Sequence, residues 1–498
     1  MILARKLLDG SAALVIAASL GACGGEAQRT GAKDPPLAEA HRAKMNTLWS
    51  PTRRARLSKA VRGASRAFTD DDVSRLDERV STWTDAWVRS AAEVDAAAHA
   101  GRLDAAHVAA SRACLEVERV EYGALLDGLN RACREPGCQA ERVSNLDWQL
   151  IEAEQSTRAC PQPAFAAAYL ESNLAEPEAL DTLGHFLALE ALGDDTRLGR
   201  SLEATLARHT SPSPFRTRLL LLEGRRLLRS ENRPAEAIVL LDAGLAEANA
   251  RGDELEAAAL RTARSDANHR LLRLPEAQRD AALALEHSER ALGSEHVETA
   301  LARASLGAVS SELDVERAAI ALDRARLTLT RGLGPTHALT ARIELALGQL
   351  EAHLGDAGAS QRWLTRGTSS TAVAFGAQHL AMSDAVRCNA EAESALGNTR
   401  TGVALFDRAL QIDLRILGQV HPRVASGWAA LGASQERAGQ PLPALGSYEK
   451  SLAVAQRLPE PQRRSLTRDV CTRIARLPAE VHPAPAAASC ADATEAER

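Results

Sequence analysis

The chain has 498 residues, and 60 basic against 65 acidic side chains give a formal net charge of -5. This mild acidity argues against a nucleic-acid-binding protein, which would carry a basic surplus. Aromatic residues make up only 3% of the chain, so the core must be built mainly from Ala, Leu and Val. Ala and Leu favour helices, whereas strands prefer β-branched and aromatic residues. We therefore expect an all-α protein.

The first residues have the pattern of an exported lipoprotein. Arg5 and Lys6 precede a short apolar stretch, which ends in Leu-Gly-Ala before Cys23. The stretch has the length of a signal-peptide core and is too short to span a bilayer. Its ending resembles a bacterial lipobox, so we expect cleavage before Cys23 and attachment of lipid to its thiol. An ordinary secretory signal followed by a chance cysteine is the alternative interpretation.

The expected segments at this end are a signal peptide over 1–22 and a flexible tether over 23–36. Gly24 takes the place of the Asp that would retain a lipoprotein in the inner membrane. We therefore expect the protein in the bacterial cell envelope, anchored by its N-terminal lipid, with the outer membrane favoured over the inner membrane. No apolar run reaches about 18 residues, so the sequence predicts no transmembrane helix.

Residues 37–162 are expected to form a small helical domain. Helices are predicted over about 103–129 and 141–157, after an earlier helix that begins with a capping pattern. Trp83 and Trp87 share one face of that earlier helix. Apolar residues at this spacing favour a core position over a ligand platform.

Cysteine usage agrees with export. Of the 8 cysteines, seven remain after Cys23, so at least one is free or pairs between chains. Cys114 and Cys133 are expected on one helix, about 28 Å apart, and so cannot pair with each other. The plausible bridges are Cys114 with Cys160, Cys133 with Cys138, and Cys471 with Cys490.

Two further interpretations of the cysteines stay open. Cys388 is the best candidate for a free thiol, and a small buried hydrophobe is a better reading of it than a catalytic group. A zinc site is the competing interpretation for Cys133 and Cys138. Their spacing is loose and no second cysteine pair lies nearby, so we expect no metal there.

A five-residue marker recurs in the C-terminal half. A large apolar residue and Gly are followed by two variable residues and by His296, His337, His379 or His421. The histidines are 41, 42 and 42 residues apart, and a fixed period of this size indicates a solenoid. Equivalent helices of stacked repeats lie about 8–10 Å apart, too far for the histidines to share one metal ion. We expect each histidine to cap or pack the turn that enters a repeat.

Each period holds two helical patterns separated by a break. In the last period, Gly432 lies in the first helix, Gly439 in the break and Tyr448 in the second helix. This pattern resembles the tetratricopeptide repeat (TPR), in particular the 42-residue kinesin-light-chain type. The resemblance implies a right-handed α-solenoid of about seven helical hairpins over residues 175–457, preceded by the small helical domain. A C-terminal helix and flexible tail are expected over 458–498.

Individual repeats depart from the family pattern. Asp314 stands where the glycine of the break is expected, and Gly367 where Ala or Ser is usual. The upstream copies match the repeat pattern less closely, and Gly184 and Gly193 mark the first of them. These departures weaken single repeats without changing the expected fold.

The N-terminal region has a resemblance of its own. Its matching residues are Arg75-Leu76-Asp77, Trp87-Val88, Cys114-Leu115-Glu116, the stretch from Leu125 to Leu129, and Cys160-Pro161. They resemble the extracytoplasmic segment between the membrane helix and the TPR array of some bacterial serine/threonine kinases. Such relatives often carry a further cysteine where this chain reads Ala96 to Arg102, so their disulfide is not carried over.

Motifs of known enzymes are absent from the sequence. It holds no phosphate-binding loop, no nucleophile elbow, no zinc-protease motif and no kinase catalytic motif. We expect no catalytic residue, no cofactor and no metal. The expected function is a protein-interaction scaffold without nucleic-acid partners, and the alternative is a sensory or adaptor subunit of a kinase-type signalling system that lacks its own kinase domain. A third possibility, an enzyme or glycan-binding accessory, is disfavoured by the low aromatic content.

The TPR register predicts which side chains face the concave groove, if Trp428 takes the usual fourth position. The polar and charged candidates are Arg342, Gln349, Arg387, Glu391 and Glu436. They would hold an extended or helical peptide by charge-assisted hydrogen bonds. A solvated face without ligand is the alternative. As a surface residue, Arg387 is expected to tolerate reversal to Glu without loss of the fold.

Overall fold

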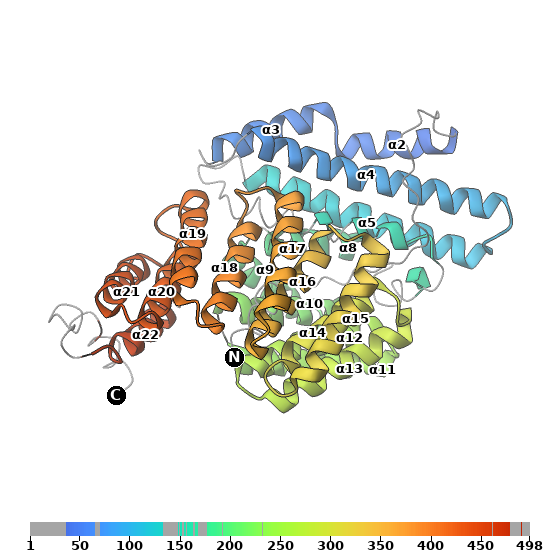
Figure 1. Ribbon diagram of the computed structural model, residues 1–498. Coiled ribbons are helices and arrows are strands. Elements are labelled where there is room, and N and C mark those ends of the chain that lie inside the picture. The colour runs from blue at the N-terminus through green and yellow to red at the C-terminus, as the bar shows by residue number, and fades with distance from the viewer. Residues whose placement is uncertain are drawn as a thin grey trace. The chain divides into compact units, whose positions relative to one another are not determined.

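The computed structural model describes most of the chain after the N-terminal segment. The described residues are 36–64, 70–132, short pieces between 148 and 167, 177–478 apart from 192, 232 and 461, and Cys490. Every regular element in these residues is a helix (Figure 1), which confirms the all-α prediction. The signal peptide with Cys23, and the pair Cys133 and Cys138, lie outside the described residues.

The chain separates into two compact units, Met1–Pro335 and Thr336–Arg498. The helices of the first unit are α2 Pro36–Leu48, α3 Pro51–Ala64, α4 Asp70–His99, α5 Ala105–Ala132, α8 Pro177–Ala191, α9 Asp195–Leu206, α10 Pro214–Arg226, a π-helical turn η1 Leu227–Glu231, α11 Pro234–Arg251, α12 Glu254–Arg270, α13 Leu274–Leu292, α14 Val297–Ser310 and α15 Val315–Leu333. Those of the second unit are α16 Ala338–Leu354, α17 Ala357–Phe375, α18 Leu380–Ala395, α19 Thr399–Leu417, α20 Pro422–Arg437, α21 Pro441–Ala455 and α22 Gln462–Ile474.

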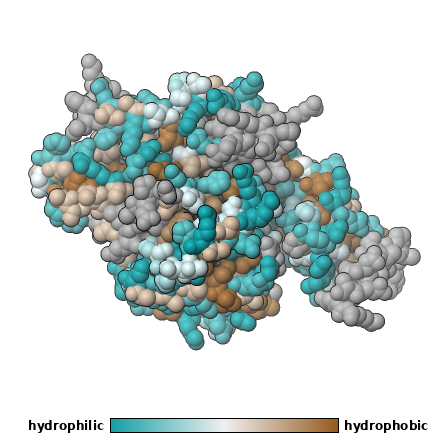
Figure 2. Space-filling model, turned by 180° about the vertical axis from the view of Figure 1, so that it is seen from behind, coloured by the Kyte–Doolittle hydropathy of each residue, from teal (hydrophilic) through white to brown (hydrophobic). Residues whose placement is uncertain are grey.

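Consecutive helices pack in pairs from α8–α9 to α20–α21, and the pairs from α10–α11 onward are the most extensive. These pairs are the TPR-like hairpins that the sequence predicted, so the fold is an α-solenoid of helical hairpins preceded by a helical region. None of the described helices combines the length and apolar character that crossing a bilayer requires. On the face drawn in Figure 2, hydrophilic residues cover most of the coloured surface, and hydrophobic residues form small separate patches.

The recurring marker is a helix exit followed by a helix entry. Its glycines end the second helices with positive φ, for example 86° at Gly293 and 76° at Gly418, a conformation that side chains disfavour. Each histidine then takes the N-cap position of the next first helix, where its Nδ1 accepts a hydrogen bond from the backbone N–H two residues on. The prediction that the histidines cap the turn is confirmed.

Small residues let the two helices of a hairpin approach closely. A Cβ on Gly348 of α16 would lie 2.6 Å from Cγ of Leu364 on α17. A Cβ on Gly432 of α20 would lie 2.7 Å from Cε1 of Tyr448 on α21. Both positions therefore admit no side chain without separation of the helices.

The first hairpin uses its glycine differently. A Cβ on Gly184 of α8 would meet Cβ of Ala124 on α5 at 2.9 Å, and no atom of α9 is among its nearest neighbours. The close approach therefore joins α8 to the N-terminal helices and not to its own hairpin partner.

The two other departures also have physical explanations. Asp314, in the place of a break glycine, is the N-cap of α15, and its carboxylate accepts a hydrogen bond from the Arg317 backbone N–H at 3.0 Å. At Gly367 a Cβ would lie 2.8 Å from Cγ of Leu345 and 2.9 Å from the Ala341 carbonyl oxygen. The local packing thus requires glycine there.

Candidate partner-binding surface

The predicted groove residues lie on the first helices of three successive hairpins in the second unit. Arg342 and Gln349 are on α16, Arg387 and Glu391 are on α18, and Glu436 is on α20. Gln349 is only 2% exposed, and the other four are half-buried. None of the five is therefore a fully solvated side chain.

One contact brings two of the predicted residues together. Gln349 Nε2 donates a hydrogen bond of 2.7 Å to Glu391 Oε2, across the boundary between neighbouring hairpins. The residues are 42 positions apart, which is one repeat period. A hydrogen bond to an ionised group is stronger than one between neutral groups. It therefore holds α16 and α18 in register through their polar faces.

Arg387 has a different role from the one predicted. Its guanidinium donates to Oδ2 of Asp413 on α19 at 2.9 Å, and to the hydroxyl of Ser383 at 3.3 Å. Asp413 is completely buried, and the Arg387 side chain is only 13% exposed. The expectation that Arg387 is a surface residue is wrong, and we expect its reversal to Glu to destabilise the fold, because a Glu there would face a buried carboxylate.

A second arginine, which sequence reasoning missed, completes this ion cluster. Arg423, at the start of α20, donates to Oδ1 of Asp413 at 3.0 Å and to Oδ1 of Asp384 on α18 at 2.7 Å. It also donates to the Leu380 carbonyl oxygen. Burial alone would lower the pKa of Arg423, but the two carboxylates raise it. Arg423 thus ties α18, α19 and α20 together.

A signal for this cluster exists in the sequence. Asp413 interrupts the buried face of α19, where its neighbours Leu410, Ile412 and Ile416 are apolar and buried. A lone acid on a buried helix face needs a cationic partner, since an unpaired buried charge is costly. The sequence does not say which arginine supplies it, because both partners come from other helices.

Glu436 is engaged within its own hairpin. The Tyr448 hydroxyl donates to Glu436 Oε2 at 2.9 Å. Burial and this hydrogen bond raise the pKa of Tyr448. Tyr448, which packs between α20 and α21, therefore also holds Glu436, one of the residues predicted for the groove.

The exposed part of the surface lies between these fixed groups. The Asp384 side chain remains 54% exposed although it is paired with Arg423. Ser426, one helical turn beyond Arg423, is exposed on α20. A partner would therefore contact Asp384 and Ser426 first, because Arg387 and Arg423 are more buried.

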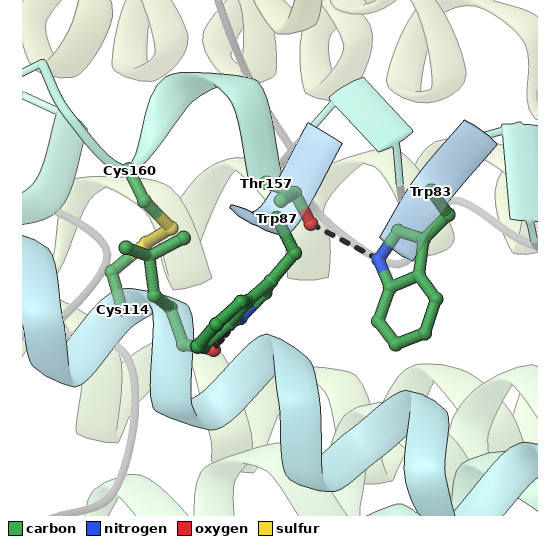
Figure 3. Close-up of a disulfide and its surroundings, with 6 residues drawn as sticks. Trp83, Trp87, Cys114, Thr157 and Cys160 are labelled. Atoms are coloured by element: carbon green, nitrogen blue, oxygen red, sulfur yellow. Dashed lines mark hydrogen bonds between the residues drawn. A yellow bond between two sulfur atoms is a disulfide. The ribbon is translucent and has the colours of Figure 1, made fainter. Parts of the chain in front are cut away.

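The cysteines fall into three groups. Cys114 and Cys160 form a disulfide with a Cα–Cα distance of 5.6 Å (Figure 3), and Cys471 and Cys490 form one with 5.5 Å. Cys388 is half-buried on α18 and belongs to neither disulfide.

Trp83 and Trp87 pack near the Cys114–Cys160 disulfide and do not form a ligand platform. Trp83 is completely buried and Trp87 is 3% exposed, which confirms the prediction of a core position. Trp87 Nε1 donates to the Leu115 carbonyl oxygen at 2.7 Å, and Trp83 Nε1 donates to Oγ1 of Thr157 at 3.1 Å, as Figure 3 shows for the latter. Among the described residues, no group of three or more His, Cys, Asp or Glu side chains has the arrangement of a metal site.

Similarity to known proteins is found among solved structures only. No protein-family model matches the chain, and no curated protein matches it. BtubC (BKLC) from P. vanneervenii is a similar solved structure, with 20% identity, a TM-score of 0.36, and coverage of 44% of this chain and 88% of that chain. A Signal Transduction ATPase with Numerous Domains (STAND) protein with a tetratricopeptide repeat sensor, from Pyrococcus horikoshii, shares 12% identity at a TM-score of 0.36, covering 72% of this chain and 60% of that one. At these scores the fold assignment rests on the hairpins described above.

Proposed function

We propose that the protein is a non-enzymatic scaffold that binds a protein or peptide partner along the first helices of its C-terminal hairpins. The observation that carries this proposal is the pair of polar links between successive hairpins, Gln349 to Glu391 and Arg423 to Asp384. Both links hold charged groups in place before any partner arrives. Preorganised groups lose less entropy on binding, which favours recognition.

The partner chemistry follows from the exposed groups. Asp384 and the half-buried Glu391 present carboxylates, whereas the arginines of the cluster are turned to Asp413 and Asp384. A partner segment with Lys or Arg side chains, or with free backbone N–H groups, would pair with these acceptors. Because the carboxylates are partly exposed, salt should weaken the capture.

The test is crosslinking and pull-down of the protein from intact cells with a matched pair of variants. Ser426→Tyr places a bulky side chain on the exposed face of α20, and Ser369→Tyr does the same on α17, a second helix. We expect Ser426→Tyr to reduce recovery of the partner and Ser369→Tyr to leave it unchanged. Equal recovery with both variants would argue against a groove on the first helices.

We further propose that Cys23 carries a lipid that anchors the scaffold in the cell envelope. The proposal rests on the short apolar stretch that ends in Leu-Gly-Ala before Cys23. Cys23→Ala should move the protein from the membrane fraction to the soluble fraction. Retention of this variant in the membrane, with no other anchor present, would contradict the proposal.

The alternative function is a sensory or adaptor subunit of a kinase-type signalling system. One observation favours it: residues that carry the resemblance to kinase-linked segments pack together, because Trp87 donates to Leu115 beside the Cys114–Cys160 disulfide. A signalling component among the crosslinked partners would support the adaptor. Partners without such a component would favour the general scaffold.

A further inference from the structure

The outer face of α15 exposes large apolar side chains in a line. Ile320 and Leu327 are 51% and 43% exposed, and they lie seven residues apart, which is two helical turns along one face. Leu313, in the turn just before the helix, is 46% exposed. We call these three residues the α15 ridge. The opposite face of the helix is buried through Ala318, Leu322 and Ala325.

The two helical positions of the ridge are particular to this hairpin, whereas its turn position is not, because Leu272, 41 positions before Leu313, is also exposed. In α13, the second helix of the preceding hairpin, the residues 41 positions before Ile320 and Leu327 are Arg279 and Glu286, and both are exposed. Charged residues are what a solvated outer face normally carries. The repeat architecture therefore does not itself require apolar residues at these positions.

Charges of opposite sign flank the ridge on its two sides. Glu316 and Asp323 lie four residues before and three after Ile320, and so occupy one flank. Arg317 and Arg324 lie three before and four after it, and occupy the other flank; both arginines are exposed. The basic flank continues at Arg331, four residues after Leu327.

Two of these flanking charges have surface partners. Asp323 pairs with Arg326 at 2.8 Å, and Arg331 pairs with Glu295 at 2.6 Å. The Arg331–Glu295 pair is exposed on both sides, and such pairs contribute about 0–1 kcal/mol and exchange readily. In the other pair the Arg326 side chain is 13% exposed, but the Asp323 carboxylate is 48% exposed and faces solvent. Both pairs therefore leave the flanks able to pair with an incoming surface.

We propose that the α15 ridge is a self-association surface, on which α15 of a second copy of this chain lies parallel. When two helices pair parallel around a two-fold axis, the left flank of one faces the right flank of the other. The acidic flank of each α15 then meets the basic flank of its partner, on both sides of the apolar line. An antiparallel pair would place like charges together, so the charge pattern selects the parallel arrangement.

The association is expected to be weak. One pair of helices buries less than the roughly 1,200 Å² that a stable interface needs. The dimer should therefore form with rising protein concentration and dissociate on dilution. Sedimentation velocity of the purified full-length protein over a concentration series measures this equilibrium directly.

Replacement of an apolar ridge residue by a charged one tests the ridge. Ile320→Asp should weaken the dimer by about tenfold or more, because it puts a charge at the centre of the contact. Arg279→Asp, at the matching position of α13, should leave the dissociation constant unchanged. A protein that stays monomeric at every concentration, or equal effects of the two variants, would overturn the proposal.

Charge variants test the parallel geometry. Arg317→Glu with Arg324→Glu makes both sides of Ile320 acidic and should abolish the dimer. Adding Glu316→Arg and Asp323→Arg exchanges the two flanks, which restores complementarity in a parallel pair and so should restore the dimer. Circular dichroism establishes that each variant is folded. Failure of restoration in a folded four-fold variant would contradict the parallel arrangement.

Discussion

The N-terminal helices and the hairpins of the second unit are stabilised by contacts of different range. In α2–α5, the contacts join distant positions: His41 with Asp95, and Lys44 with Glu116. In α16–α21 the contacts join neighbouring helices, at separations close to one repeat period or less. The N-terminal region thus depends on contacts that only the folded chain brings together, whereas each hairpin depends on its neighbours. The loss of one contact should therefore destabilise the whole N-terminal region, whereas in the second unit its effect should stay local.

Arg387→Glu should have the largest effect and should test whether damage stays local. It replaces one of the two arginine partners of buried Asp413 by a like charge, and breaking a buried pair costs about 3–5 kcal/mol. We expect faster amide hydrogen exchange in α18–α20 and little change in α16–α17. Arg408→Glu, at an exposed position of α19, should stay within about 0.5 kcal/mol of the parent. Exchange that accelerates equally throughout the second unit would contradict nearest-neighbour stability.

Removal of the Cys114–Cys160 disulfide is the matching test for the N-terminal region. The double variant Cys114→Ser with Cys160→Ser releases a cross-link over 46 positions and should cost about 2–4 kcal/mol. Because Trp87 packs beside it, we expect tryptophan fluorescence to report a lower midpoint of urea unfolding. Cys471→Ser with Cys490→Ser, over 19 positions, should cost less and leave that signal unchanged. The opposite ranking would show that the first disulfide is not what holds the long helices.

Features that depend on neighbouring residues could be predicted from the sequence, whereas contacts between separate helices could not. The helix entries and exits were predictable, because a glycine and a histidine at each boundary act on residues within a few positions of themselves. The core position of Trp83 followed from helical periodicity. The engagement of Arg387 was not predictable, because Asp413 and Arg423 approach it from two other helices. The TPR register places a residue on a face, but it does not say which neighbour that residue contacts.

The packing of α8 against α5 could not be predicted from the sequence for the same reason. Gly184 looks like any repeat glycine, yet its close neighbour is Ala124, which is 60 positions earlier. Repeat patterns assume that the partner is the next helix. Where the array meets the N-terminal helices, this assumption fails.

His296 offers a pH-dependent test at a repeat entry in the first unit. Burial lowers the pKa of His296 to about 3, whereas the unfolded side chain titrates near 6.5. The unfolded state therefore binds a proton first, so stability is fully present above about pH 6.5 and falls as the pH drops towards 3. At about 1.4 kcal/mol per pH unit, the loss at pH 5 is on the order of 2 kcal/mol.

The variant His296→Asn sharpens this prediction. Asn is a good N-cap residue and does not titrate in this range. It should preserve helix α14 at pH 7 and remove part of the acid sensitivity, as measured by urea unfolding at a series of pH values. An unchanged pH dependence would mean that other groups, and not the buried histidine, govern acid unfolding of this unit.

Gly348→Ala is the smallest expected effect and tests the hairpins themselves. The added Cβ would lie 2.6 Å from Cγ and 3.1 Å from the backbone nitrogen of Leu364. Overpacking of this kind costs about 1–3 kcal/mol, and the higher helix propensity of Ala returns about 1 kcal/mol. The net loss should be about 1 kcal/mol. Gly446 of α21 is the matched control, because no atom lies within 4 Å of its added Cβ.

At Gly446 the same substitution should stabilise the second unit by up to about 1 kcal/mol, since only the propensity term remains. Opposite signs for two Gly→Ala changes, both in helices of one unit, would isolate close helix approach as the reason for glycine in the repeats. If both substitutions stabilise, then α16 and α17 can separate at little cost. The hairpins would then owe their stability to contacts between repeats, such as Gln349 with Glu391, more than to packing within each pair.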